Sequence, residues 1–457
     1  MAAATPLATS RAQLRFVAID GGPHYFATKS PLSAWMDGRI LLGAWDEQPQ
    51  SLTDVRRDVA MGDNIYWDLS GGSVDYNVIR QGGMHISAPS EDSNTGSETV
   101  SWNGDDEPDM RLGPGSAGER ITDSSEACTT GGTQCGYTDV KWYDGGDAAN
   151  ISGGARLPYT PDGRVVHTGF GKGVLFWESN AQAARFLPYS GILSADSYWL
   201  TDNDLQTAST GGCALQPHNP TICRGGSGTG LDYQQSHLPA NYAYNVTRLR
   251  SLDALDGGST PIVVDVETGC PGEGDNAGNC ATPPETIAAA WHALIPGARG
   301  IVWFQHNFSG ACVDFRTFLD GSNPASRMYN CQQTPGVTLH DVVRAVSGFN
   351  HEVDALSRVL LAPTAVNYAR TTADVSTMAK AYGGVCYVFA ASGRPAEPPA
   401  PDAAARFTLA GGYTGTVSVF GEHRALYARR GTFTDRFANE NAVHIYEIPD
   451  WSLCRTP

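Results

Sequence analysis

The apolar positions of the first 360 residues alternate between two spacings, one typical of strands and one typical of helices. Residues 51–60 show the helical spacing, because Leu52, Val55 and Val59 share one helical face behind Ser51 as N-cap. Short apolar or alternating runs before and after this segment predict strands. These runs are residues 39–46, 64–69, 84–88 and 99–103. Strands that alternate with helical segments predict βα units and a parallel sheet.

Four more strand-like runs follow before residue 310. They are residues 164–176, 191–200, 261–269 and 300–307. Helical patterns at residues 238–255 and 284–294 separate the later runs. Eight βα units close into a barrel, whose functional side chains lie at the C-terminal strand ends. We therefore predict an α/β fold, a (β/α)8 TIM barrel, over residues 36–360.

The pattern changes after a last helical segment, residues 339–361, which ends before Pro363. Short strand-like runs separated by turn residues predict a small antiparallel β-sandwich over residues 361–457. These runs are residues 366–369, 385–390, 405–409, 415–420, 425–428 and 443–448. Residues 1–35 contain two more strand-like runs, which we expect to pair with the sandwich or to cover the base of the barrel.

Composition and charge narrow the range of partners. The chain of 457 residues is 41% hydrophobic, which is enough for a large core. Its formal net charge of −17 opposes binding to nucleic acid or to an anionic membrane. No run approaches the roughly 18 apolar residues of a membrane span, and the first residues lack the apolar core of a signal peptide. We expect neither nucleic acid nor membrane insertion.

The ten cysteines fall in close couples that predict five disulfides. The couples are Cys128 with Cys135, Cys213 with Cys223, Cys270 with Cys280, Cys312 with Cys331, and Cys386 with Cys454. The first four bracket polar, Gly-rich loops that have little apolar material to order them. Because C-x-x-C pairs and clustered histidines are lacking, we expect no metal and no cofactor. Five disulfides predict an extracellular protein or a virion component, in an oxidising environment.

The candidate chemistry begins at residues 99–109, TVSWNGDDEPD, where a strand-like run enters four acids within five residues. Such crowding raises a carboxyl pKa, as a general acid near neutral pH requires. An isolated acidic turn closed by Pro108 is more often a solvated surface feature. A second acid, Glu267, ends the apolar run of residues 261–269, so two predicted strands deliver acids.

This order of features resembles the retaining (β/α)8-barrel glycoside hydrolases that carry acids after strands four and seven and a C-terminal β-sandwich. The resemblance covers about residues 36–450. It implies that Glu107 is the acid/base and Glu267 the nucleophile. Asp106 stands where that family usually has an asparagine bound to the sugar 2-hydroxyl, which implies a different sugar contact at this position.

Five further residues are candidates for substrate contact. The resemblance implies that Tyr198 holds the nucleophile and that Trp303 forms the floor of a sugar subsite. Trp45, His85 and His306 lie near predicted strand ends, where they could touch a sugar. Each of the five has an alternative role in the core or in structural hydrogen bonds.

The sequence also resembles, more loosely, the barrel domains of minor tail proteins from phages that infect actinobacteria. Two functions therefore stay open. One is a glycoside hydrolase acting on an extracellular or cell-wall polysaccharide, with a lyase or transglycosylase as a variant on the same site. The other is a catalytically inactive glycan-binding or structural virion protein, whose partners include a cell-surface glycan and other phage tail subunits.

Overall fold

The computed structural model describes residues 14–18, 20–69, 75–89, 95–104, 107, 109, 162–177, 180–184, 186–202, 205, 230–271, 280–308, 312–314 and 316–454. Among the residues singled out above, Asp106, Pro108 and the couples Cys128 with Cys135 and Cys213 with Cys223 lie outside these ranges.

Eight parallel strands form a single sheet in the order β7-β6-β5-β4-β3-β2-β9-β8. In chain order they are β2 (Leu41–Glu47), β3 (Ile65–Leu69), β4 (His85–Pro89), β5 (Thr99–Asn103), β6 (Val166–Phe170), β7 (Ile192–Ala195), β8 (Val263–Glu267) and β9 (Gly300–Phe304). The edge strands β7 and β8 meet where Leu193 pairs in parallel with Ile262. The sheet is thus a nearly closed barrel, and the predicted eight-strand barrel is confirmed.

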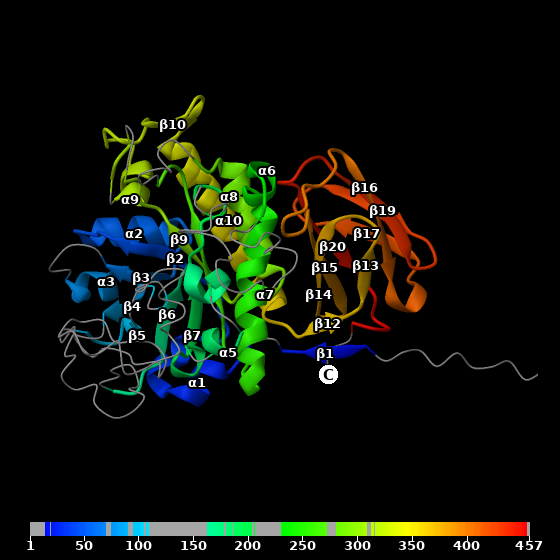
Figure 1. Ribbon diagram of the computed structural model, residues 1–457, viewed down its shortest axis with the longest axis horizontal. Helices are drawn as coiled ribbons and strands as arrows, with labels where there is room; N and C mark the ends of the chain where they lie inside the picture. The colour runs from blue at the N-terminus through cyan, green and yellow to red at the C-terminus, as the bar shows by residue number, and fades with distance from the viewer. Residues whose placement is uncertain are drawn as a thin grey trace, which may run out of the picture.

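Helices cover the outside of this barrel (Figure 1). The longer ones are α2 (Leu52–Ala60), α3 (Tyr76–Gly82), α7 (Tyr242–Asp253), α8 (Pro283–Leu294) and α10 (Leu339–Leu360). Ser51 accepts the Asp54 amide at the start of α2, as its position predicts. Shorter elements are η4 (Gly173–Trp177), α5 (Asn180–Ala183), η5 (Leu187–Tyr189), α6 (Tyr233–Ser236), η7 (Pro239–Asn241), η8 (Ala254–Asp256), α9 (Thr317–Gly321), β10 (Gln332–Thr334) and β11 (Val337–Thr338).

The N-terminal segment seals the amino end of the barrel. Phe26 of α1 (Tyr25–Lys29) and Met36 of η1 (Pro31–Met36) join the buried cluster formed by the inner side chains of the strands. Tyr25–Lys29 is a helix and not the strand we predicted. Its Tyr25 and Phe26 are adjacent in sequence and both buried. Neighbouring residues of a strand point to opposite faces, so a strand with one exposed face would leave one of the two exposed.

The C-terminal strands form two antiparallel sheets. A seven-stranded sheet has the order β1-β12-β14-β15-β20-β17-β18, and a three-stranded sheet has the order β13-β16-β19. Their bounds are β1 (Arg15–Val17), β12 (Thr364–Val366), β13 (Ala369–Thr371), β14 (Val375–Tyr382), β15 (Val385–Ser392), β16 (Ala403–Leu409), β17 (Gly415–Val419), β18 (Arg424–Ala428), β19 (Thr432–Phe437) and β20 (Val443–Ile448), with η10 (Ala410–Gly412) after β16. This arrangement confirms the predicted β-sandwich, and β1 pairs with β12 at its edge.

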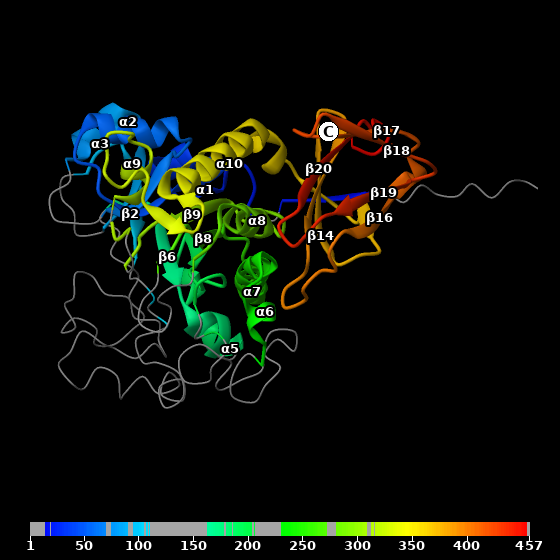
Figure 2. The same cartoon turned by 90° about the horizontal axis from the view of Figure 1, so that it is seen from above.

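Helices α8 and α10 separate the barrel strands from the sandwich (Figures 1 and 2). Trp291 of α8 stacks on Phe389 of β15 with ring centroids 5.7 Å apart. His292 Nε2 lies 2.9 Å from the Ser392 carbonyl oxygen, and Asn241 Oδ1 accepts the Ala396 amide at 2.7 Å. One apolar core therefore runs from the barrel helices into the sandwich.

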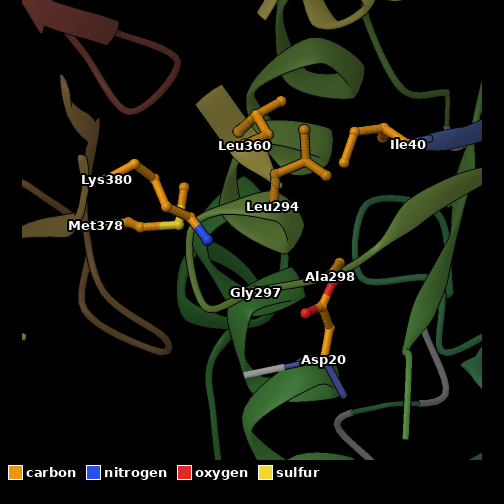
Figure 3. A pocket seen from close by; sticks show the side chains of 8 residues that line it. All are labelled: Asp20, Ile40, Leu294, Gly297, Ala298, Leu360, Met378 and Lys380. Atoms are coloured by element: carbon orange, nitrogen blue, oxygen red, sulfur yellow. The ribbon is translucent and has the colours of Figure 1, made fainter. Parts of the chain in front are cut away.

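A small pocket with a polar side lies at this junction (Figure 3). Lys380 of β14 and Asp20 point into it from different elements, and Lys380 Nζ donates to the Ala362 carbonyl oxygen at 3.0 Å. Asp20 is paired with Arg299. Burial lowers the pKa of Lys380 to about 8, against the opposing effect of the Asp20 charge. The pocket thus lies where the sandwich meets the base of the barrel, beside the Asp20–Arg299 ion pair.

Three of the predicted disulfides lie in the described chain. Cys270 pairs with Cys280, Cys312 with Cys331, and Cys386 with Cys454. The last joins the sandwich strand β15 to the C-terminal segment and closes a sequence separation of 68 residues. No helix among the described residues is long and apolar enough to cross a membrane.

Candidate active site

Two carboxylates reach the C-terminal end of the barrel on the strands where we predicted them. Glu267 is the last residue of β8, the seventh barrel strand. Glu107 follows β5, the fourth barrel strand, and its amide donates to the Gly169 carbonyl oxygen of β6 at 3.1 Å. Because all eight strands are parallel, both acids lie at the same end of the barrel.

The side chain of Glu267 begins on the inner face of the barrel. Val263 of the same strand belongs to the interior cluster, and residues two and four positions further share its face. The Glu267 carboxyl is fully buried and accepts two hydrogen bonds, from the Leu200 amide to Oε1 at 2.8 Å and from the Tyr242 hydroxyl to Oε2. Donors from the loop after strand six and from the first turn of α7 therefore fix its orientation.

Burial changes the acidity of this carboxyl. It raises the pKa of Glu267 to about 8, with smaller increases from the charges of Asp202 and Glu285, while hydrogen bonds from the backbone oppose the shift. A carboxylate nucleophile must be ionised when it attacks. A carboxyl with this pKa is mostly protonated at pH 7, so the free protein holds Glu267 chiefly in its neutral form.

Glu107 lies in an unusual backbone conformation. Its φ is 43°, in the left-handed region that residues other than glycine rarely adopt. Asp46 and Asp68, at the ends of the first and second barrel strands, also have positive φ, at 54° and 73°. Such conformations concentrate at functional sites, where the surrounding structure holds them. Glu107, Asp46 and Asp68 thus lie at or after the C-terminal ends of barrel strands, and all three have a positive φ that regular strands do not have.

Asp109, another of the four clustered acids, serves the backbone. It is buried and accepts the Gly171 amide at 3.0 Å and the Val174 amide at 2.6 Å. Burial raises its pKa to about 7, with a smaller increase from the charge of Glu107. Through these two hydrogen bonds, Asp109 connects the segment after strand four to the turn after strand five. We infer that they help to keep Glu107 near the end of the barrel.

Aromatic side chains line the barrel end beside Glu267. Phe304 of β9 is paired with Glu267 across the two strands. The Phe304 ring packs on Tyr198 with centroids 4.6 Å apart and on Trp45 at 5.5 Å. His306 meets the Trp45 ring edge-on at 5.5 Å. The structure thus brings the predicted residues Trp45, Tyr198 and His306 together around Phe304.

Two other predicted residues lie elsewhere. Trp303 is on the outer face of β9, where its Nε1 donates to Asn350 Oδ1 of α10 at 3.1 Å, so it packs between the barrel and a helix. His85 begins β4 at the amino end of the barrel and stacks on Trp35 of η1 with centroids 3.7 Å apart. His85 therefore lies at the end of the barrel opposite Glu267, and not near the candidate active site where we predicted it.

The sequence analysis missed two residues that adjoin Glu267. Tyr242, and not Tyr198, provides the described hydroxyl bond to this acid. The one feature of the sequence that could have pointed to Tyr242 is its position at the start of the helical pattern that follows the sixth predicted strand. Phe304 holds the inner position of strand eight, because Val302, two residues earlier, belongs to the interior cluster. In the structure, Phe304 and not Trp303 is the residue of β9 that is paired with Glu267 of β8.

The described residues include no group of three or more histidine, cysteine, aspartate or glutamate side chains placed to hold a metal ion. The side chains described at the C-terminal end of the barrel include carboxylic acids and aromatic rings.

Comparison with family models finds no match, and comparison with curated proteins finds none either. Similar solved structures include a GH30 endoxylanase from Clostridium papyrosolvens C71, at 8% identity and TM-score 0.41, covering 90% of this chain and 96% of that chain. A maltogenic α-amylase from Thermotoga neapolitana is 8% identical at TM-score 0.43, covering 90% of this chain and 98% of that chain. The strand pairing of the chain itself, and not this distant likeness, identifies it as a (β/α)8 barrel with an attached β-sandwich.

Proposed function

We propose that this protein is a retaining glycoside hydrolase that cuts an extracellular or cell-wall polysaccharide. The observation that carries the proposal is the delivery of Glu107 and Glu267 to one end of a single barrel, after strands four and seven. The aromatic residues around Phe304 support it, because sugar rings stack on aromatic faces.

In the proposed reaction, Glu267 attacks the anomeric carbon while Glu107 donates its proton to the departing glycosidic oxygen. A covalent glycosyl-enzyme results. Glu107, now ionised, removes a proton from a water molecule, which attacks the same carbon and releases Glu267. The Tyr242 hydroxyl and the Leu200 amide hold the nucleophile in place throughout.

The raised pKa of Glu267 fits this reaction under one condition. The carboxyl must lose its proton before it attacks, so the proposed enzyme works best where Glu267 is ionised. The hydrogen bonds from Tyr242 and Leu200 favour the charged form, and they limit the increase that burial causes.

A second candidate is a glycan-binding protein that does not cut, such as a receptor-binding component of a phage tail. The complete burial of Glu267 favours it, because a nucleophile must meet its substrate. Both candidates place the protein outside the cytoplasm, in keeping with its three described disulfides.

A glycan screen separates the two candidates. Purified protein is incubated with mycobacterial-type arabinogalactan and with common plant and bacterial polysaccharides, and new reducing ends are measured. The hydrolase proposal predicts release from at least one polysaccharide. Binding to a glycan without release would favour the second candidate.

A further inference from the structure

Two buried ring nitrogens on the inner face of the barrel, one a donor and the other an acceptor, have no hydrogen-bond partner among the described residues. They belong to Trp67 of β3 and His167 of β6, whose ring centroids lie 4.7 Å apart. Trp67 is 0% exposed and His167 is 5% exposed. Within the described chain, neither Trp67 Nε1 nor His167 Nε2 has a hydrogen-bond partner.

The surroundings of His167 define which of its nitrogens carries the proton. Asn103 Oδ1 accepts from the Ser87 hydroxyl at 2.9 Å and lies 2.9 Å from His167 Nδ1. An amide oxygen can only accept, so Nδ1 carries the hydrogen. Burial also lowers the pKa of His167 to about 3, which keeps the ring neutral. His167 Nε2 is therefore a bare acceptor.

The indole nitrogen of Trp67 can only donate. One donor without an acceptor thus lies near one acceptor without a donor. A buried polar group left in this state destabilises the folded protein unless a bound group supplies the missing hydrogen bond. A hydroxyl group meets both needs at once, because its oxygen accepts and its hydrogen donates.

The pair lies close to the candidate active site. Gly169, two residues beyond His167 on the same face of β6, accepts the Glu107 amide through its carbonyl oxygen at 3.1 Å. A hydroxyl hydrogen-bonded to both Trp67 Nε1 and His167 Nε2 would therefore lie deeper in the barrel than the proposed acid/base.

We propose that Trp67 and His167 form a hydroxyl-recognition subsite, in which one sugar hydroxyl accepts from Trp67 Nε1 and donates to His167 Nε2. The inference rests on the proposed function, because it takes the hydroxyl to be part of the glycan substrate. Asn103 and Ser87 act as positioning residues that fix the tautomer of His167. The other source of the same chemistry is a bound water molecule.

The test removes one hydroxyl at a time from the sugar and, separately, removes the Trp67 Nε1 donor from the protein, and compares the two effects. The probes are the 4-nitrophenyl glycoside that the protein hydrolyses fastest and its monodeoxy analogues, with kcat/KM measured for wild type and Trp67→Phe. In the wild type, removing the recognised hydroxyl should lower kcat/KM at least tenfold. In Trp67→Phe the same removal should change kcat/KM by less than about threefold. His167→Leu, which removes the acceptor, should give the same loss of discrimination.

Trp102→Phe is the matched control. Trp102 is also a buried indole, but its Nε1 donates to Asp162 Oδ1 at 3.0 Å and its ring belongs to a cluster on the outer side of the barrel. It should retain the wild-type discrimination among the deoxy analogues. If every analogue loses the same factor in wild type and Trp67→Phe, the hydroxyl belongs to water and the inference is overturned.

A glycan-binding protein without hydrolysis would require a binding readout. The Trp67 indole N–H resonance, assigned by its loss in Trp67→Phe, is followed by NMR during titration with the parent monosaccharides and their deoxy forms. A shift that one deoxy form alone fails to produce supports the subsite even where hydrolysis is absent. Sugar binding that leaves this resonance unmoved contradicts the subsite alone, so the two proposals fail separately.

Discussion

Glu267 combines two properties that oppose each other. Its side chain is fully buried, which favours the neutral acid, while its two described donors favour the carboxylate. The position of this acid could be predicted from the sequence, because the apolar run before it ends abruptly in polar residues. Its partners could not, since Tyr242 lies 25 positions away and meets Glu267 only through the packing of α7 on the barrel.

The first prediction concerns Tyr242→Phe. Removing the hydroxyl takes one hydrogen bond from the ionised form of Glu267, so its pKa should rise and kcat should fall by about tenfold to a hundredfold at pH 7. The matched control is Tyr244→Phe on the same helix, whose buried hydroxyl donates to the Leu175 carbonyl oxygen at 2.6 Å. A pH–rate profile equally displaced in both variants would contradict a specific role for Tyr242.

The second prediction concerns pH. With a pKa of about 8, Glu267 is protonated at lower pH, so kcat/KM should rise as pH increases toward 8. Stability should respond in the opposite direction. A carboxyl that is more basic in the folded state than its usual value of 4.5 loses its stabilising contribution as pH rises through 8.

Glu267→Gln separates these effects. It removes the titrating group and keeps the shape, so its denaturation midpoint should exceed that of the wild type at pH 9 and approach it at pH 5. A midpoint difference that does not change with pH would show that Glu267 is not the titrating group.

At the scale of elements, the barrel strands could be predicted because parallel strands buried on both faces form continuous apolar runs. The same property concealed their orientation. Every residue of β9 is buried, so no polar position reveals which side faces the interior, and Trp303 was chosen where Phe304 lies inside.

The sandwich strand β19 was not predicted, because its inward-facing residue Asp435 is charged and interrupts the apolar pattern; in the structure Asp435 is paired with Arg424.

The third prediction concerns the segment that carries Glu107. Asp109→Ala leaves the Gly171 and Val174 amides without their acceptor, which should lower the free energy of unfolding by about 1–3 kcal/mol. Asp109→Asn keeps one acceptor and should lose less. Urea unfolding monitored by circular dichroism measures both, and an unchanged midpoint in the alanine variant would show that this tie is not needed.

At the scale of the whole molecule, the barrel and the sandwich share one core. Trp291 and Phe389 stack across the junction, and Met378 and Ile445 of the sandwich join the same apolar cluster. The sequence predicted both units from their different patterns. It did not reveal their junction, because β14 carries Lys380 at a buried position and was not recognised as a strand.

The fourth prediction is that this core makes unfolding of the two units cooperative. Phe389→Ala should lower the free energy of unfolding by about 3–5 kcal/mol, and the barrel and the sandwich should still unfold in one transition. Hydrogen exchange in β8 and in β16 reports the two units separately. Exposed Tyr427 is the control, since Tyr427→Ala should change stability by less than about 0.5 kcal/mol. Destabilisation confined to β16 would indicate independent units.

The central claim, that Glu267 and Glu107 are nucleophile and acid/base, is tested most directly by product release from wild type, Glu267→Gln and Glu107→Gln. Reducing-end and 4-nitrophenol release are measured on the same polysaccharides and aryl glycosides, with and without azide. Glu267→Gln should release nothing from any substrate. Glu107→Gln should keep most activity on aryl glycosides with good leaving groups and should form glycosyl azide when azide is added. Wild-type protein that binds a glycan without releasing product, with both variants binding equally well, would contradict the account.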